Sequence, residues 1–310
     1  MVIPIIISTF FLSIISAYFF QKYFLKNNII DKINSRSSHD SIATRSGGLS
    51  IFFVLIIISI YYYINGSEIF NFSILIPLSL LFLIGIYDDI YGIDFKLKFI
   101  FQIIAAKIII DNGLIVDNFH GFLGVYEVNR LIAQLITIFI IIAIINATNF
   151  VDGIDGLLAS ISIIFISSYE FFSSVNTDFY FLNIMVISTL IPLYYFNFRK
   201  IKKIFLGDSG SYLLGGIISI YVLNILSLGY RIKPEFDLNK IIFVISILIY
   251  PIIDIIRIFS LRLLNKKSPF IADNNHIHHN LLKNINSHFK TTVVVCCFTI
   301  LSIVLIQFFF

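Results

Sequence analysis

The feature this chain has least of is charge. Only 13% of its 310 residues are charged and 58% are hydrophobic, whereas a soluble domain averages about 25% charged residues. The mean hydropathy is +0.95. This composition excludes an ordinary soluble protein and predicts an integral membrane protein. The net charge of +4 is small, and we expect no nucleic-acid partner.

Other residue types are scarce or absent as well. The chain has no tryptophan, so an interfacial aromatic belt has to rest on its 16 tyrosines. The only two cysteines, Cys296 and Cys297, are adjacent, which excludes a structural disulfide between them because neighbours on a helix point in different directions. The first apolar segment (2–21) lacks a basic residue before it, and Lys22 and Lys26 follow it. This pattern excludes a cleaved signal peptide and predicts a retained first span with its N-terminus outside.

Long polar segments are also missing. Ten apolar segments follow one another with short polar connections between them: 2–21, 47–64, 70–87, 97–110, 131–148, 157–173, 179–196, 210–228, 240–260 and 291–310. Backbone groups in lipid must bond internally, and helices of this length achieve that. We therefore predict an all-α integral membrane protein of about ten transmembrane helices, forming one polytopic domain over residues 1–310.

Lysine and arginine gather in alternate connections. Sixteen of the 22 lie after the first, third, fifth, seventh and ninth segments, and four lie in the intervening connections. Cytoplasmic loops of membrane proteins carry an excess of these residues, so the first set of connections is predicted to be cytoplasmic. An even number of spans then places both termini on the outer, extracytoplasmic side.

Four polar motifs fall on that predicted cytoplasmic side. They are Asp88-Asp89, NATNFVDGIDGL (146–157), FLGDSGS (205–211) and HIHH (276–279). Unrelated solvated loops would have no reason to collect on one face of the membrane. The motifs therefore predict a single active site on the cytoplasmic loops.

The turn 146–157 directly follows an apolar run and holds Asn149, Asp152 and Asp155. Carboxylates this close repel each other unless a cation or hydrogen-bond donors lie between them. A divalent metal with a phosphorylated substrate would meet that need. Helix capping and a simple Asp-Gly turn are the alternative explanation.

Asp208 lies in FLGDSGS, between an apolar approach and a glycine-rich helix start. Its carboxylate suits a hard cation such as Mg²⁺. We expect the backbone amides of Gly207, Ser209 and Gly210 to be exposed there and to form a phosphate cradle.

The other two motifs are less specific. Asp88 and Asp89 end an apolar run and either solvate a helix end or belong to the site; a prenyl-synthase DDxxD motif is excluded because Gly92 stands where the last acid is required. The histidines of 276–279 are candidates for zinc, which prefers three or four His or Cys ligands in a closed site. Lysines and oxygen ligands accompany this cluster instead, so phosphate contact is the preferred interpretation and a surface cluster without function the alternative.

Taken in order along the chain, these motifs resemble those of the polyprenyl-phosphate N-acetylhexosamine-1-phosphate transferases (glycosyltransferase family 4). That superfamily also includes the phospho-MurNAc-pentapeptide transferase of peptidoglycan synthesis. The resemblance covers nearly the whole chain. Six segments carry it: DKINSRSSHDSIATRSGG (31–48), YDDIYGIDFKLKFIFQ (87–102), NATNFVDGIDGL (146–157), FLGDSGS (205–211), PIIDIIRI (251–258) and PFIADNNHIHH (269–279).

The resemblance implies a reaction at the cytoplasmic leaflet of a bacterial inner membrane, in a multi-pass protein. Undecaprenyl phosphate attacks the β-phosphate of a UDP-N-acetylhexosamine or a 6-deoxy derivative, giving undecaprenyl-diphosphate-sugar and UMP as the first membrane step of a surface polysaccharide. It also implies Mg²⁺, with Mn²⁺ as a substitute, as the cofactor. Membrane lipid surrounds the protein, and the oligomeric state is left open.

The resemblance also assigns the site residues. The implied metal ligands are Asp208 and Asn149. The implied catalytic residues are Asp88, Asp89, Asp152, His276, His278 and His279. The implied substrate-binding residues are Arg45, Lys98, Asn146, Asp155, Phe205 and Gly207. Within these sets Asp155, Phe205 and Gly207 would hold the uridine, and Lys98 and the histidines would contact phosphates. A phosphate monoester is already largely ionised near neutrality, so Asp88 and Asp89 are expected to organise charge rather than act as bases.

Three other classes of membrane protein are alternatives to this function. The HIHH spelling and Arg45 favour the sugar-phosphate branch over the muropeptide transferase, which is the nearest alternative. A membrane transporter would place ionisable residues inside spans; few are found there, and Asp254 and Arg257, one helical turn apart, can pair with each other. A CDP-alcohol phosphotransferase is excluded because its DGxxAR signature is absent. The sugar itself is not identified by the sequence.

Overall fold

The computed structural model describes residues 1–31, 42–236, 239–266 and 275–309, and it is mostly α-helical. The predicted first-loop residues 32–41 and the segment 267–274 before the histidine motif lie outside the described residues. The α-helices are α1 (Val2–Lys26), α2 (Gly47–Ile64), α3 (Leu75–Tyr91), α4 (Phe95–Asp111), α5 (Arg130–Val151), α6 (Leu157–Phe172), α7 (Tyr180–Phe198), α8 (Gly207–Leu226), α9 (Lys240–Ile247), α10 (Ile249–Leu264), α11 (Ile277–Ile285) and α12 (His288–Phe309). Short 3-10 turns lie at Phe72–Ile74, Phe122–Gly124 and Pro234–Phe236.

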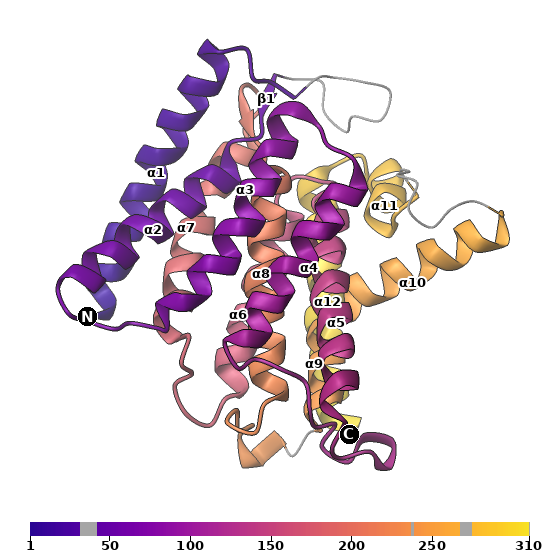
Figure 1. Ribbon diagram of the computed structural model, residues 1–310. Coiled ribbons are helices and arrows are strands. Elements are labelled where there is room, and N and C mark those ends of the chain that lie inside the picture. The colour runs from indigo at the N-terminus through magenta and orange to yellow at the C-terminus, as the bar shows by residue number, and fades with distance from the viewer. Residues whose placement is uncertain (32–41, 237–238, 267–274, 310) are drawn as a thin grey trace.

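Helix α8 forms the centre of the helical body, and α2, α3, α5, α6 and α9 pack around it (Figure 1). Of its most apolar 18-residue window, 94% is buried inside the protein, far more than for any other long apolar helix described. Both termini lie at the end of the body away from β1 and α11 (Figure 1). Asp208, at the beginning of α8, therefore belongs to the most enclosed of the long apolar helices described.

Each of the ten apolar segments contains helix, but the number of membrane spans is not confirmed. Among the described residues, seven helices are long and apolar enough to cross a membrane, or eight if one bent pair counts as a span. Helix α6 has only 16 residues and α4 only 17. The side of the membrane on which the termini lie stays a prediction.

The prediction of one helix over 240–260 is wrong. Helices α9 and α10 meet at Leu248 with a bend of 75°, and α10 extends away from the helical body (Figure 1). The sequence explains the break, because Pro251 has no backbone N–H and its ring would collide with the carbonyl of Ile247 in a continuous helix.

Two short strands join distant parts of the chain. Strand β1 (Ala43–Thr44) pairs in parallel with β2 (Lys203–Ile204). The pairing continues as the amide of Gly47 donates to the carbonyl of Phe205 at 2.9 Å. This pairing carries the segment before α2 to the start of α8, so residues 43–48 and 203–208 lie side by side.

Candidate active site

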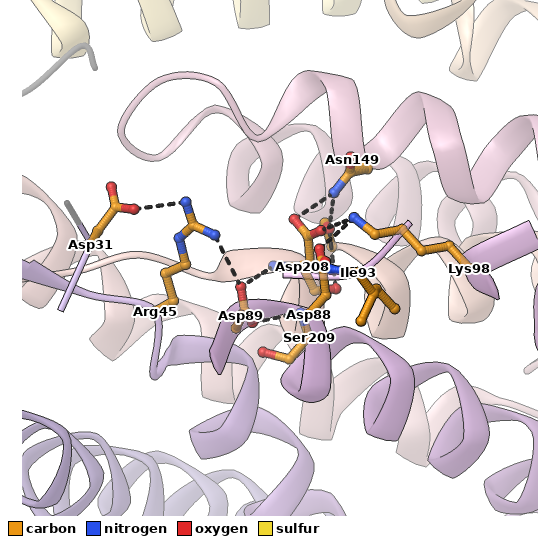
Figure 2. Close-up of polar contacts among 10 residues, drawn as sticks. Asp31, Arg45, Asp88, Asp89, Ile93, Lys98, Asn149, Asp208 and Ser209 are labelled. Atoms are coloured by element: carbon orange, nitrogen blue, oxygen red, sulfur yellow. Dashed lines mark hydrogen bonds and ion pairs between the residues drawn. The ribbon is translucent and has the colours of Figure 1, made fainter. Parts of the chain in front are cut away.

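Three helices bring charged side chains together at the beginning of α8 (Figure 2). The ammonium of Lys98, on α4, donates to Asp88 at the end of α3 and to Asp208 Oδ2 at 3.0 Å. The other oxygen of Asp88 accepts from the backbone amide of Ile93 at 2.8 Å. The structure thus unites the predicted residues Asp88, Lys98 and Asp208 around one positive charge, which offsets the repulsion between the two carboxylates.

Asn149 joins this group from α5. Its side-chain nitrogen donates to Asp208 Oδ1 at 2.9 Å and to the hydroxyl of Ser211 at 2.9 Å. With the nitrogen committed to these partners, the carbonyl oxygen of the amide is the atom that can accept a ligand. The predicted pairing of Asn149 with Asp208 in one site is therefore present. One turn earlier in α5, Asn146 donates to Gln102 of α4 at 2.9 Å and lies beside this group.

Asp89 has a different position from its neighbour Asp88. Its side chain is fully buried, and its two oxygens accept from the backbone amides of Asp208 and Ser209, each at 2.9 Å. It thereby caps the beginning of α8 from another helix, where a negative charge also suits the helix dipole. The expected exposure of the Ser209 amide to a phosphate is wrong, because Asp89 already occupies it.

Gly207 permits this cap. Its φ of +72° lies in the left-handed region, and a Cβ there would stand 2.6 Å from a carboxylate oxygen of Asp89. Any side chain would therefore strain the backbone and displace Asp89. In this structure Gly207 therefore has a structural role at the start of α8.

Arg45 closes the group on its exposed side. Its guanidinium lies 2.7 Å from Asp31 and 3.8 Å from Asp89, and 41% of its side chain is exposed. Arg45 directly follows β1, so its position depends on the pairing of β1 with β2. Figure 2 shows the whole row from Asp31 through Asp89 to Lys98.

The turn after α5 holds the remaining acids. Asp152 ends α5; burial, and then the charges of Asp208 and Asp89, raise the pKa of its carboxyl well above its usual range. Asp155 is buried and its carboxylate accepts from Lys203 of β2. Lys203 was not predicted: its only signal in the sequence is the basic run 199–203, which was used for topology alone.

A small cavity of about 20 Å³ lies next to this turn, and Phe205 and Asp152 line it. Its other walls come from α6, from α7 and from the segments beside the turn and the strands: Gly47, Gly156, Ala159, Leu193, Tyr194, Asn197, Ile204 and Leu206. Phe205 and Asp152 are therefore brought to one cavity, whereas Gly207 is not among the residues that line it.

The three histidines do not share one environment. His276 and His278 are buried, at 4% and 0% exposure, and His279 is half-buried. Burial, followed by the neighbouring histidines, lowers the pKa of His278 to about 3 and that of His279 to about 4. Both rings are therefore neutral near pH 7, which is poorly suited to holding a phosphate by charge.

The expected pairing of Asp254 with Arg257 is wrong. Asp254 accepts instead from His276 Nδ1 at 2.7 Å and from the amide of Ile277 at 2.8 Å. Arg257 donates to the backbone carbonyl of Asn275 at 2.7 Å. Residues of α10 are thus tied to α11 rather than to each other.

Within the described residues, no three Asp, Glu, His or Cys side chains form a ready cage for a metal ion. The oxygens at the site nevertheless have the right chemistry for Mg²⁺, a hard cation that takes few protein ligands and keeps several waters. Asp208 and the carbonyl oxygen of Asn149 offer such oxygens, and the amide nitrogen of Asn149 donates a hydrogen bond to Asp208.

Apolar helices packed around a buried cluster of carboxylates, an amide and an ammonium define a polytopic membrane enzyme that acts on charged groups. Residues 71–226 match glycosyl transferase family 4, and the chain belongs to this family. The matched residues include Asp88, Lys98, Asn149 and Asp208, while Arg45 and the histidine motif lie outside them.

Relatives match the chain over most of its length. A Bacillus subtilis protein named a probable undecaprenyl-phosphate N-acetylglucosaminyl 1-phosphate transferase is 32% identical over 87% of this chain and 74% of its own. A Thermotoga maritima protein named undecaprenyl-phosphate alpha-N-acetylglucosaminyl 1-phosphate transferase is 30% identical over 96% of this chain and 85% of its own. The Escherichia coli protein of the same name is 28% identical over 90% and 76%.

Proposed function

We propose that this protein transfers N-acetylglucosamine 1-phosphate from UDP-N-acetylglucosamine to undecaprenyl phosphate at the cytoplasmic face of a bacterial inner membrane. The names of the relatives support the lipid acceptor and the sugar. The observation that carries the chemistry is the group of Asp88, Lys98 and Asp208 at the start of α8. Two anionic phosphates must meet in this reaction, and the site offers fixed charges of both signs to receive them.

In the proposed reaction an oxygen of the lipid phosphate attacks the β-phosphorus of the donor. The bond from that phosphorus to the bridging oxygen breaks, and UMP leaves. Lys98 and Arg45 would offset the negative charge of the two substrates as they approach. The lipid phosphate is already largely ionised near neutrality, and Asp88 is bonded to Lys98, so Asp88 organises charge and needs no role as a base.

We further propose that Asp208 and Asn149 hold Mg²⁺, with Asp152 close by. When bound, the ion would stabilise charge that builds up on the phosphate oxygens. The raised pKa of Asp152 fits this assignment, because burial and then the neighbouring carboxylates favour its protonated form, and a cation would oppose that preference.

The small cavity lined by Phe205 and Asp152 marks the proposed place of the nucleoside, which would have to widen it on binding. Phe205 would stack on the base, and Asp155 directly precedes the lining residue Gly156. The carboxylate of Asp155 is paired with Lys203, and both of these side chains are largely buried. To bind the base, Asp155 would have to accept from the ligand as well as from Lys203.

The test is release of UMP by purified protein supplied with undecaprenyl phosphate, Mg²⁺ and UDP-N-acetylglucosamine. Asp208→Asn should lower turnover by roughly 100-fold, the scale of losing one charged transition-state contact, while thermal unfolding shows a folded protein. Asp178→Asn is the matched control: it changes an exposed acid beside the start of α3 and the end of α4, the ends opposite to Asp88 and Lys98.

Normal turnover by Asp208→Asn would remove the metal assignment. Absence of UMP release with UDP-N-acetylglucosamine and with a panel of other UDP-N-acetylhexosamines would remove the transferase function itself.

A further inference from the structure

His278 is enclosed on all sides. None of its surface is exposed, and its Nδ1 lies 2.8 Å from the hydroxyl of Tyr250, which is itself buried. Tyr250 is the second residue of α10 and follows directly on the bend between α9 and α10. The ring of His278 is therefore fixed from one side by the beginning of α10.

The other side of the ring lies against the turn that follows α5. His278 Nε2 is buried and has no hydrogen-bond partner. A Cβ added to Gly153 would stand 2.4 Å from that nitrogen, so only glycine leaves room for the ring. A buried polar nitrogen without a partner costs free energy, so packing alone does not explain a histidine here.

Gly153 separates the two acids of the turn. Asp152 precedes it, and the charge of Asp208 acts on the carboxyl of Asp152. One turn earlier in α5, Asn149 bonds directly to Asp208. A shift of the turn at Gly153 would therefore move Asp152 relative to Asp208, and the ring of His278 lies directly against that turn.

We propose that His278 is a positioning residue: Tyr250 holds its ring against Gly153, and the ring fixes the turn 152–156 relative to Asp208. The bend at the start of α10 is thereby linked to the active site. His276 is held in a comparable way, through its Nδ1, by Asp254 of α10.

The test uses two conservative changes of buried tyrosines. Tyr250→Phe removes the hydroxyl that holds His278. Tyr221→Phe, the matched control, removes a buried hydroxyl that has no hydrogen-bond partner. Amide hydrogen exchange over residues 152–156 should speed up in Tyr250→Phe and stay unchanged in Tyr221→Phe. This readout does not depend on the proposed function.

The kinetic arm rests on the proposed function. Tyr250→Phe should lower kcat by about tenfold, the scale of a misplaced catalytic group, and leave both KM values nearly unchanged. His278→Gln should give a similar loss, and the double variant should be no worse than either single one, because both act through one contact.

Three results would overturn the proposal. They are wild-type hydrogen exchange at 152–156 in Tyr250→Phe, additive losses in the double variant, and a rise in KM at constant kcat in His278→Gln. The last would make His278 a direct substrate ligand. If wild-type protein releases no UMP, the proposed function fails, and the exchange measurement still decides the positioning role.

Discussion

Asp88 and Asp89 are adjacent in sequence, yet the structure gives them unlike surroundings. Asp88 meets Lys98, while Asp89 is enclosed beneath Arg45 and bonds two amides of α8. Asp89→Asn would place an NH₂ group or a weaker acceptor against those amides. We expect a loss of about 1–3 kcal/mol in the free energy of unfolding, and slower turnover because Asp208 loses its anchor.

Thermal unfolding and UMP release measure these two effects. Asp94→Asn is the control, because Asp94 is exposed and caps no helix with its side chain. An Asp89→Asn protein as stable and as active as the wild type would contradict the capping role.

The pKa of His278 makes stability depend on pH. The folded value is about 3, below the ordinary value of about 6.5 expected in the unfolded chain. Above pH 6.5 the ring is neutral in both states; below it the unfolded chain binds a proton that the folded protein refuses. Stability therefore falls as the pH drops from 6.5 toward 3, by about 2 kcal/mol at pH 5.

His278→Gln cannot titrate and should lose this part of the dependence. The measurement is the thermal unfolding midpoint of wild type and variant between pH 7.5 and pH 5. Parallel curves for the two proteins would show that His278 does not remain neutral.

At the residue scale, the sequence predicted which residues lie together in the site better than it predicted which of them contact one another. Asp88, Lys98, Asn149 and Asp208 were expected together and lie together, because oxygen-rich motifs at one membrane face have few other reasons to occur. The cap made by Asp89 could not be predicted, since its partners are 119 and 120 positions away and no local pattern encodes them.

At the scale of elements, the pairing of β1 with β2 fixes the positions of two charged contacts relative to each other. Lys203 of β2 holds Asp155, and Arg45 after β1 lies beside Asp89. Lys203→Met would leave the buried Asp155 carboxylate without its cation. We expect a loss of about 3–5 kcal/mol in stability, the scale for breaking a buried ion pair from one side.

Thermal unfolding of Lys203→Met tests this expectation, with Lys202→Met, an exposed neighbour, as the control. Lys203→Arg should recover most of the loss because it keeps the charge. Equal unfolding midpoints for the two methionine variants would refute the buried pair.

The helices were easier to predict than their joints. Long apolar runs specify helices in a membrane protein, and each of the ten runs contains one. The bend at Leu248 was missed although Pro251 marks it, because the apolar run continues through the break. Two-residue strands such as β1 and β2 have no periodicity to recognise.

For the whole molecule, the distribution of lysine and arginine predicts which end of the bundle faces the cytoplasm. The two ends of α8 allow a direct check. Ile201→Cys precedes the helix and Leu228→Cys follows it, and both native side chains are well exposed, at 72% and 75%. In a background carrying Cys296→Ser and Cys297→Ser, an impermeant maleimide should label Leu228→Cys in intact cells.

The cysteine at position 201 should react only after the membrane is opened. The reverse labelling result would invert the predicted topology. The site would then lie outside the cytoplasm, where it would have no supply of UDP-sugars.

The enclosure of α8 also bears on how such an enzyme can diversify. Asp208 lies in the first turn of α8, a helix with almost no exposed surface. Of the most apolar 18-residue window of this helix, 94% is buried. Because α8 packs against five other helices, we expect mutations along it to disturb the fold, which would keep the reacting centre constant. Under the proposed function, different donor sugars would then have to be accommodated at the rim, near Arg45, β2 and the outlying α10. On that proposal, the chemistry and the selectivity for the sugar would rest on separate parts of the molecule.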